Sequence, residues 1–493
     1  MFWGFKVLLM LAISYATNRL AQLREPKDDK RPEPQGQGDI QAPTVEEGRT
    51  IPVIWGTVHL NSPNVVWYGD LHAQWYQTWL VWLYFLSVQY AWCHGPVDAV
   101  QRFYWDDVEV IPRQYLGPPP PIGEPITLPL EPPINSVWIQ EGELWGGHDE
   151  EGGLQGRYVF MWGTDDQTAN YYLAEKLGVD YDDMPPYRGL CYSLALTDPP
   201  FDFYQGTSAY IKPHSLVLSR WPNQLGLEDD KHKIGLDLNP AAMLYEVLID
   251  QVWGLGVPAA QIDIASFIAA GDTLHGEGFG LSFQHGDTTD GEVIVKEVLR
   301  HIDGVLVPHE TTGLLTLRLI RDDYDPETLL ELGDDEIVEL EEFFRPGPEG
   351  LANKILLTYI DAAQHYKKKT AIAVDTAGVQ SLGGVIPQDV NFLGISNATL
   401  AQTIAARELK AAAHPFAALR LTVNRTAYAL RPGSAFKFSR AALGISGMIC
   451  RVVSIGFGPL TDGLIRIEAV EDAFGVDWTA YTPPAPSGWA PFE

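Results

Sequence analysis

The chain has 493 residues, 46% of them hydrophobic and 20% charged, which excludes a disordered or fibrous protein and indicates a globular chain of about three domains. Its 34 basic and 64 acidic residues leave a formal net charge of -30, which argues against a protein that grips a nucleic-acid backbone. Cys93, Cys191 and Cys450 lack the spacing of a zinc site or a disulfide framework, so we expect buried free thiols.

The first 40 residues can be interpreted in three ways. Residues 2–16 are apolar except for Lys6, and residues 25–39 are rich in proline and charge, which predicts an extended linker. The apolar stretch is shorter than the roughly 20 residues that span a membrane. A retained hydrophobic helix, a secretory signal peptide and a membrane-active segment all stay open. We favour the retained helix, because Leu20 and Leu23 extend its apolar face beyond the point where a signal would be cleaved.

The pattern of the following residues, up to 133, predicts strands and turns. We predict a β-hairpin over 50–70 and a strand buried on both faces over 79–93, stopped by Gly95-Pro96. A second hairpin is expected over 103–111, and the proline-rich residues 116–133 predict a surface loop.

The middle of the chain mixes helices with strands. Helices are predicted over 168–177, from Asn239-Pro240 to Gly254 with Val252 on the apolar face, and over 290–301. Strands are predicted over 190–196 and 209–218, and a hairpin joins 304–308 to 314–321. The last part reads as a β domain with one alanine-rich helix over 399–413, and its strands are expected at 355–359, 419–424, 446–456 and 464–470.

Sequence motifs that mark catalytic, phosphate-binding or metal-binding sites in other proteins are incomplete in this chain. His309-Glu310 lacks the second histidine of a zinc-peptidase helix, and Ser282 and Ser446 lack the frame of a nucleophile elbow. The glycines of 276–280 precede no phosphate-binding lysine, and the acidic run 322–342 lacks the ligand order of a calcium loop. We therefore assign no catalytic, cofactor-binding or metal-ligating residue, and we expect no enzyme.

An aromatic cluster beside Asp70 and His72 allows an alternative. Rings at close spacing are usual in cores and subunit interfaces, but they also form sugar-binding platforms next to carboxylates. A secreted carbohydrate-active β-rich enzyme and a cell-surface adhesin therefore remain the alternatives. The cluster consists of Trp67, Tyr68, Trp75, Tyr76, Trp79 and Trp82.

Several motifs along the chain resemble one family. Residues 48–58 (GRTIPVIWGTV) and 64–70 (NVVWYGD) look like the opening of the tail-tip and baseplate hub proteins of long-tailed phages and gene transfer agents. The resemblance covers roughly residues 45–475, with each motif only moderately specific. Further matching motifs are 92–98 (WCHGPVD), 187–192 (YRGLCY), the helix block 239–257 and 312–324 (TGLLTLRLIRDDY).

The resemblance implies a homotrimeric hub in the virion tail tip, of α+β and predominantly β fold. Such a hub has two β-barrel-like domains, caps the tail tube, anchors the tape-measure protein and opens to pass DNA. Other tail-tip or receptor-binding proteins are expected as partners. The domains expected are a hydrophobic helix and linker (1–40), the first part of the first barrel-like domain (41–135), an inserted loop and α+β region with return strands (136–238), a helix-containing α+β middle domain (239–345), the second barrel-like domain with one helix (346–475) and a proline-rich tail (476–493).

The net charge suits a ring that conducts DNA, because a negative lumen repels phosphates within a Debye length of about 10 Å. We expect part of the run Asp325–Glu342, or the loop Glu141–Glu151, to face the channel. Three copies of the segment Phe2–Leu23 are expected to meet near the axis, against the tape-measure protein, or at another apolar partner such as a host membrane.

Overall fold

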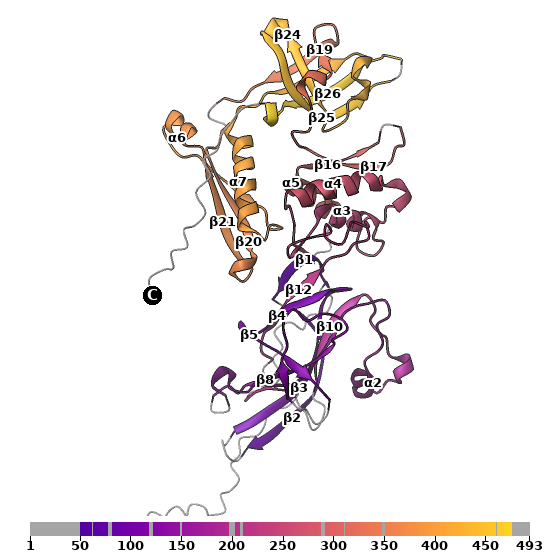
Figure 1. Cartoon of the computed structure of the whole chain (residues 1–493), viewed down its shortest axis with the longest axis vertical. Helices are drawn as coiled ribbons and strands as arrows, with labels where there is room; N and C mark the ends of the chain where they lie inside the picture. The colour runs from indigo at the N-terminus through magenta and orange to yellow at the C-terminus, as the bar shows by residue number, and fades with distance from the viewer. Residues whose placement is uncertain are drawn as a thin grey trace, which may run out of the picture.

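The computed structural model describes residues 50–475, except 62, 77–80, 118–121, 148–149, 197–202, 208–210, 287–290, 310, 348–350 and 460. The expected N-terminal helix and the proline-rich tail lie outside the described residues. The fold is predominantly β, as predicted. Figure 1 shows an elongated molecule with the first sheets at one end, helices in the middle and another sheet at the far end. None of the described helices is long and apolar enough to cross a membrane.

Two antiparallel sheets, five-stranded and eight-stranded, share the first core. The five-stranded sheet has the order β15 (Phe283–His285), β1 (Val53–Leu60), β12 (His214–Arg220), β4 (Ala99–Trp105) and β5 (Val108–Val110). The eight-stranded sheet consists of β2 (Asn64–Tyr76), β3 (Val81–His94), β6 (Arg113–Tyr115), β7 (Ile122–Pro125), β8 (Ser136–Glu141), β9 (Leu154–Met161), β10 (Leu190–Leu196) and β11 (Tyr204–Gly206). The helix α2 (Tyr171–Leu177) lies beside them, and Gly178 ends it in a left-handed conformation as predicted.

The hairpin predicted over residues 50–70 is wrong. Strands do form there, but β1 pairs with β12 and β15, whereas β2 pairs with β3. The predicted loop over 116–133 also contains the short strand β7. The buried strand β3 and the hairpin of β4 and β5 are confirmed.

The middle of the molecule is helical. It contains α3 (Pro240–Ile249), α4 (Ile264–Gly276), α5 (Gly291–Ile302) and the hairpin of β16 (Gly304–Pro308) and β17 (Leu315–Leu319). Asn239 caps α3 by accepting a 3.1 Å hydrogen bond from the Ala241 backbone, as its sequence predicted. The expected apolar role of Val252 is wrong, because α3 ends at Ile249 and Val252 is 84% exposed. A two-stranded ribbon, β13 (Lys233–Ile234) and β14 (Asp237–Leu238), precedes α3.

The last part contains two separate sheets. The three-stranded sheet has the order β21 (Lys367–Val374), β20 (Lys354–Asp361) and β22 (Pro387–Asn391), and it is accompanied by α6 (Thr376–Leu382) and α7 (Ala398–Ala413). The six-stranded sheet has the order β18 (Glu331–Leu332), β24 (Ala435–Arg440), β25 (Ile445–Phe457), β26 (Ile465–Glu471), β23 (Ala418–Val423) and β19 (Ile337–Phe344). The strand predicted at 355–359 therefore belongs to a different sheet from the other three predicted strands.

A buried ion pair joins the first sheets to the helices. Arg220 at the end of β12 binds Glu246 of α3 with both terminal nitrogens, at 3.0 and 2.5 Å. Trp55 of β1 donates a 2.7 Å hydrogen bond to the same carboxylate. Because both charged side chains are at most 5% exposed, the three residues fix α3 against the five-stranded sheet.

Candidate functional site

The carboxylate of the aromatic cluster is already bound. Tyr172 of α2 donates a 2.6 Å hydrogen bond to Asp70, and Lys176 lies 3.0 Å from the same oxygen. Trp67 packs edge-on against Tyr172 with ring centroids 6.3 Å apart. Asp70 thus connects α2 to the hairpin of β2 and β3. This arrangement favours a packing role for the aromatic cluster over a catalytic role.

The other rings of the cluster pack across the same hairpin. Trp75 and Trp82 are cross-strand partners with centroids 5.3 Å apart, and His72 stacks on Phe85 at 4.8 Å. Tyr68 is 38% exposed. The ring of Tyr76 and the whole of Trp79 lie outside the described side chains.

Ser282 takes part in a hydrogen-bond network, and the glycine run 276–280 contains a turn. Ser282 donates a 2.5 Å hydrogen bond to Asp237, whose pKa burial raises, and accepts one from the Thr57 backbone at 3.0 Å. Gly278 turns the chain after α4 with φ +65°. His309 lies in the β16–β17 turn, where its ring accepts from the Thr311 backbone at 3.3 Å, and Glu310 lies outside the described residues.

No set of three or more His, Cys, Asp or Glu residues in the described ranges could hold a metal ion. The cysteines are buried and free, as predicted. Cys191 faces Cys93 across β10 and β3, and burial raises the pKa values of Cys191 and Cys450.

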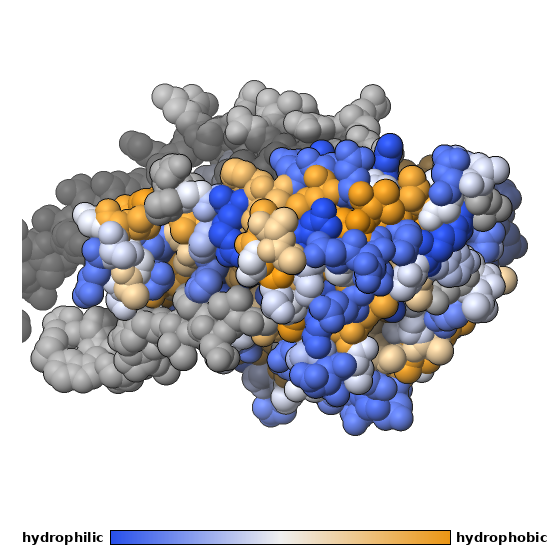
Figure 2. Space-filling view, turned by 90° about the horizontal axis from the view of Figure 1, so that it is seen from above, coloured by the Kyte–Doolittle hydropathy of each residue, from blue (hydrophilic) through white to orange (hydrophobic). Residues whose placement is uncertain are grey.

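Part of the acidic run is neutralised on the outer face of the six-stranded sheet. Arg420 of β23 lies between Glu342 of β19 and Glu468 of β26, at 3.3 and 3.0 Å, and Ser454 of β25 donates to Glu468 at 2.9 Å. These four residues form a polar row across four adjacent strands. Viewed from this end, the surface shows apolar patches interrupted by hydrophilic side chains (Figure 2).

The loop Glu141–Glu151 is also partly neutralised. Glu151 binds Lys212, which lies 3.8 Å from Asp106. The Lys212 ammonium lies 4.7 Å from the centroid of the Trp145 ring. The channel-facing role expected for this loop and for the acidic run stays a prediction, and the carboxylates without a cationic partner would contribute most of the negative charge there.

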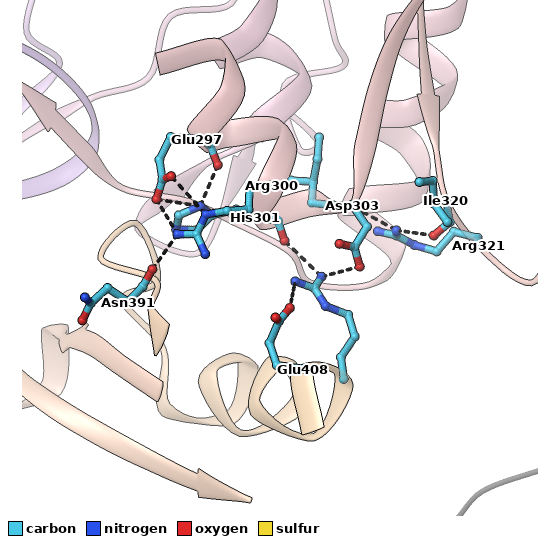
Figure 3. Close-up of polar contacts among 10 residues, drawn as sticks. Glu297, Arg300, His301, Asp303, Ile320, Arg321, Asn391 and Glu408 are labelled. Atoms are coloured by element: carbon cyan, nitrogen blue, oxygen red, sulfur yellow. Dashed lines mark hydrogen bonds and ion pairs between the residues drawn. The ribbon is translucent and has the colours of Figure 1, made fainter. Parts of the chain in front are cut away.

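A network of polar contacts joins the end of α5 to the three-stranded sheet and its helix α7 (Figure 3). Arg300 binds Glu297 at 2.6 Å and also donates to the Asn391 backbone oxygen at the end of β22, at 2.5 Å. Its guanidinium lies 4.1 Å from the centroid of the Phe392 ring. Arg407 of α7 reaches the same helix end. We call Glu297, Arg300, His301, Asp303, Arg321, Asn391, Arg407 and Glu408 the α5 junction.

Two arginines bind the last carbonyls of α5. Arg407 donates to the His301 oxygen at 3.1 Å, and Arg321 donates to the Ile302 oxygen at 2.9 Å. Carbonyls at a helix C-terminus lack partners within the helix and carry partial negative charge, so cations there are stabilising. Arg321 also binds Glu277, the residue that follows α4, at 2.6 Å, and its own backbone oxygen accepts from Arg451 of β25 at 3.1 Å. The junction therefore connects the helices, the three-stranded sheet and the six-stranded sheet.

Burial changes the titration of this junction. It lowers the pKa of His301 to about 4, despite opposing contributions from the carbonyl and carboxylate of Glu297. Burial raises the pKa of Asp303, against the attraction of Arg407 2.9 Å away. Burial would also raise the pKa of Glu297, but the hydrogen bond from Arg300, the charge that His301 carries when it is protonated at acid pH, and the charge of Arg300 outweigh it and lower that pKa. The histidine is thus neutral near pH 7 and the arginines carry the charge.

The sequence offered only a weak signal for this junction. Arg300 and His301 in the last turn of a predicted helix indicate a helix end, where basic residues are favoured. Nothing in the local pattern indicates that Arg407, a hundred positions later, binds there. Its partners depend on how the units pack.

Residues 291–455 match a family described as putative phage tail protein. The match begins at the first residue of α5 and includes all eight residues of the α5 junction. Among solved structures, a chain from the virion of a native gene transfer agent (GTA) particle is 16% identical, with a TM-score of 0.58 over 89% of each chain. No curated protein matches the chain.

Two further solved structures resemble the chain less. The 43 kDa tail protein of prophage MuSo2 from Shewanella oneidensis is 10% identical, with a TM-score of 0.31 over 86% of this chain and 99% of that one. The tail protein from Neisseria meningitidis MC58 is 10% identical, with a TM-score of 0.33 over 76% and 96%.

The resemblance to phage tail proteins is therefore confirmed. By sequence it covers residues 291–455, and the likeness to the gene transfer agent chain shows that the fold is shared over most of the molecule.

Proposed function

We propose that this chain is a structural hub protein of a phage tail, located in the virion at the tail tip. In this role three copies form a ring that caps the tail tube, anchors the tape-measure protein and opens as a DNA conduit during genome ejection. The observation that carries the proposal is the fold shared with a chain of the gene transfer agent virion over 89% of both chains. The match of residues 291–455 to a phage tail family supports it independently.

The sheets supply two units suited to such a ring. β18 and β19, the two ends of the six-stranded sheet, are connected by residues 333–336, so the sheet curls back on itself around one core. We assign it as the second barrel-like hub domain. The two sheets that share the first core form the first hub domain, and the domain limits at residues 135, 238 and 345 remain part of this proposal.

The aromatic cluster beside Asp70 does not support the alternative functions, a carbohydrate-active enzyme or a cell-surface adhesin. The carboxylate that a sugar-cleaving enzyme would use, Asp70, is bound by Lys176 and Tyr172. The proposal therefore assigns no enzymatic activity, and the partners are other tail proteins and a second and third copy of the chain.

Size-exclusion chromatography with light scattering tests the proposal on the full chain. A trimer that binds isolated tail tubes supports it, and electron microscopy of that complex should show a threefold ring at the tube end. A monomer that does not bind tail tubes, or a monomer that hydrolyses glycans, would contradict the proposal. Mass spectrometry of the same sample identifies the N-terminus and separates the retained segment from a cleaved signal.

A further inference from the structure

A groove of about 720 Å³ lies between α5, β15 and β22. Its apolar lining includes Trp55, Phe283, Ile294 and Val390. Val293 of α5 and Leu393 after β22 are 54% and 39% exposed at this groove. Exposed aliphatic side chains beside a concave apolar lining are typical of a binding surface.

Two open sheet edges form the walls. In the described part of the chain β15 pairs only with β1, and β22 pairs only with β20. The walls meet at one end, where the Ser282 backbone donates to the Gly394 oxygen at 2.8 Å. Edge strands with unpaired backbone groups are usually covered or paired in soluble proteins. The groove thus offers both apolar surface and backbone hydrogen bonds to an occupant.

The start of the described chain lies next to the groove. Thr50 donates to the Gly286 backbone oxygen, and Val53 pairs with His285, which lines the groove. Residues 24–49, which link this point to the apolar N-terminal segment, reach roughly 85 Å when extended. The segment Phe2–Leu23 can therefore return to the groove of its own chain.

Charge favours this end of the chain over the other. Residues 1–24 contain Lys6, Arg19 and Arg24 and no acidic residue, whereas residues 476–493 contain two acidic residues and no basic one. At the groove, Glu297 is bound to Arg300, and Asp389 has no ion-pair partner among the described residues. A cationic apolar segment complements this surface, and an acidic tail does not.

We propose that the segment Phe2–Leu23 docks in this groove of the same chain, which covers its apolar side chains before the protein meets its tail partners. Burial of apolar surface drives the docking. The inference goes beyond the proposed function and does not depend on it, because it concerns the free chain.

Hydrogen exchange of the full chain tests the docking. Deletion of residues 2–23 should speed amide exchange in residues 291–297 and 387–393 by about tenfold or more, because a docked segment protects the amides that it covers. The matched control is deletion of residues 476–493, which should leave exchange at the groove unchanged. Unchanged exchange after the N-terminal deletion, or deprotection by the C-terminal deletion, would overturn the proposal.

A second experiment tests the proposal without the deletion of residues 2–23, and its result is therefore valid even if that deletion alters folding. A photo-crosslinking amino acid in place of Leu8 should crosslink to α5 or β22 in the intact protein, and Val293→Lys should reduce that yield at least about fivefold because the charge is desolvated in the bound state. Mixing isotopically labelled and unlabelled chains separates docking within one chain from docking between two. Crosslinks only between chains, or only to residues outside the groove, would overturn the proposal.

Discussion

Arg407 of α7 donates a hydrogen bond to the backbone oxygen of His301, 3.1 Å away in the last turn of α5. The same guanidinium lies 2.9 Å from Asp303, the residue that follows α5. One side chain therefore binds both the helix end and the carboxylate beyond it. Because α7 packs on the three-stranded sheet, this contact helps to set the angle between that sheet and the helices.

Replacement of Arg407 should loosen this connection. Arg407→Met keeps most of the side-chain length, but it leaves the His301 oxygen and Asp303 without their donor. We expect the free energy of unfolding to fall by about 1–3 kcal/mol, the cost of unsatisfied groups in a partly buried setting. Urea unfolding of the purified protein measures it.

The matched control for that variant is Arg420→Met. Arg420 also bridges two acidic groups, Glu342 and Glu468, but its side chain is 49% exposed. Exposed ion pairs contribute about 0–1 kcal/mol, so this variant should lose less stability. Equal losses in the two variants would show that the α5 junction is no more than a surface ion pair.

The buried pair of Arg220 and Glu246 should be more sensitive. Glu246→Gln leaves the Arg220 charge without its carboxylate in a position where both side chains are at most 5% exposed. Breaking a buried pair costs about 3–5 kcal/mol, and a double replacement by apolar residues, Arg220→Met with Glu246→Leu, should cost less than the single change. Guanidinium unfolding of the two variants compares them, and a double variant less stable than Glu246→Gln would contradict the expectation.

Sequence patterns predicted the ends of helices where a capping residue or a glycine marks them. Asn239 before Pro240 predicted the start of α3, and Gly178 predicted the end of α2. The helix α4 was missed because Gly271 interrupts its pattern. That glycine is explained only by packing, since an added Cβ would lie 3.0 Å from the Leu227 side chain.

Pairing between distant strands was not predictable in the same way. β1 and β2 are separated by three residues, a spacing typical of a hairpin, yet Leu60 of β1 pairs with Leu216 of β12. Such a partner depends on the packing of the whole core. The α5 junction has the same origin, because Arg407 and His301 meet only after two units have folded together.

The buried histidines should make stability depend on pH. Burial lowers the pKa of His214 to about 3, and its ring stacks on Trp105 with centroids 3.7 Å apart. Between pH 6.5 and about 3 the unfolded chain binds a proton at this residue that the folded chain does not, so stability falls as pH falls through this range. The slope from His214 alone is about 1.4 kcal/mol per pH unit.

His214→Phe should remove this contribution and flatten the slope between pH 6 and 4.5. The variant also loses the 2.8 Å contact of Nε2 with Tyr158, so its stability at pH 7 should be lower than that of the parent chain. Denaturant midpoints across pH measure both effects. His309→Gln, at an exposed turn, is the control, and an unchanged slope in His214→Phe would contradict the assignment.

Charge reversal tests the proposed conduit. Asp335 and Glu339 lie within the acidic run, are exposed, and form no ion pair in the described part of the chain, so they can contribute to a negative channel wall. Asp335→Lys with Glu339→Lys should slow genome ejection at low salt, because the reversed charges attract the phosphates that pass. The difference should vanish at high salt as screening shortens to about 3 Å at 1 M. The equally exposed Asp229→Lys with Asp230→Lys is the matched control, and a slowing of equal size in both double variants would remove the case for a channel position of the acidic run.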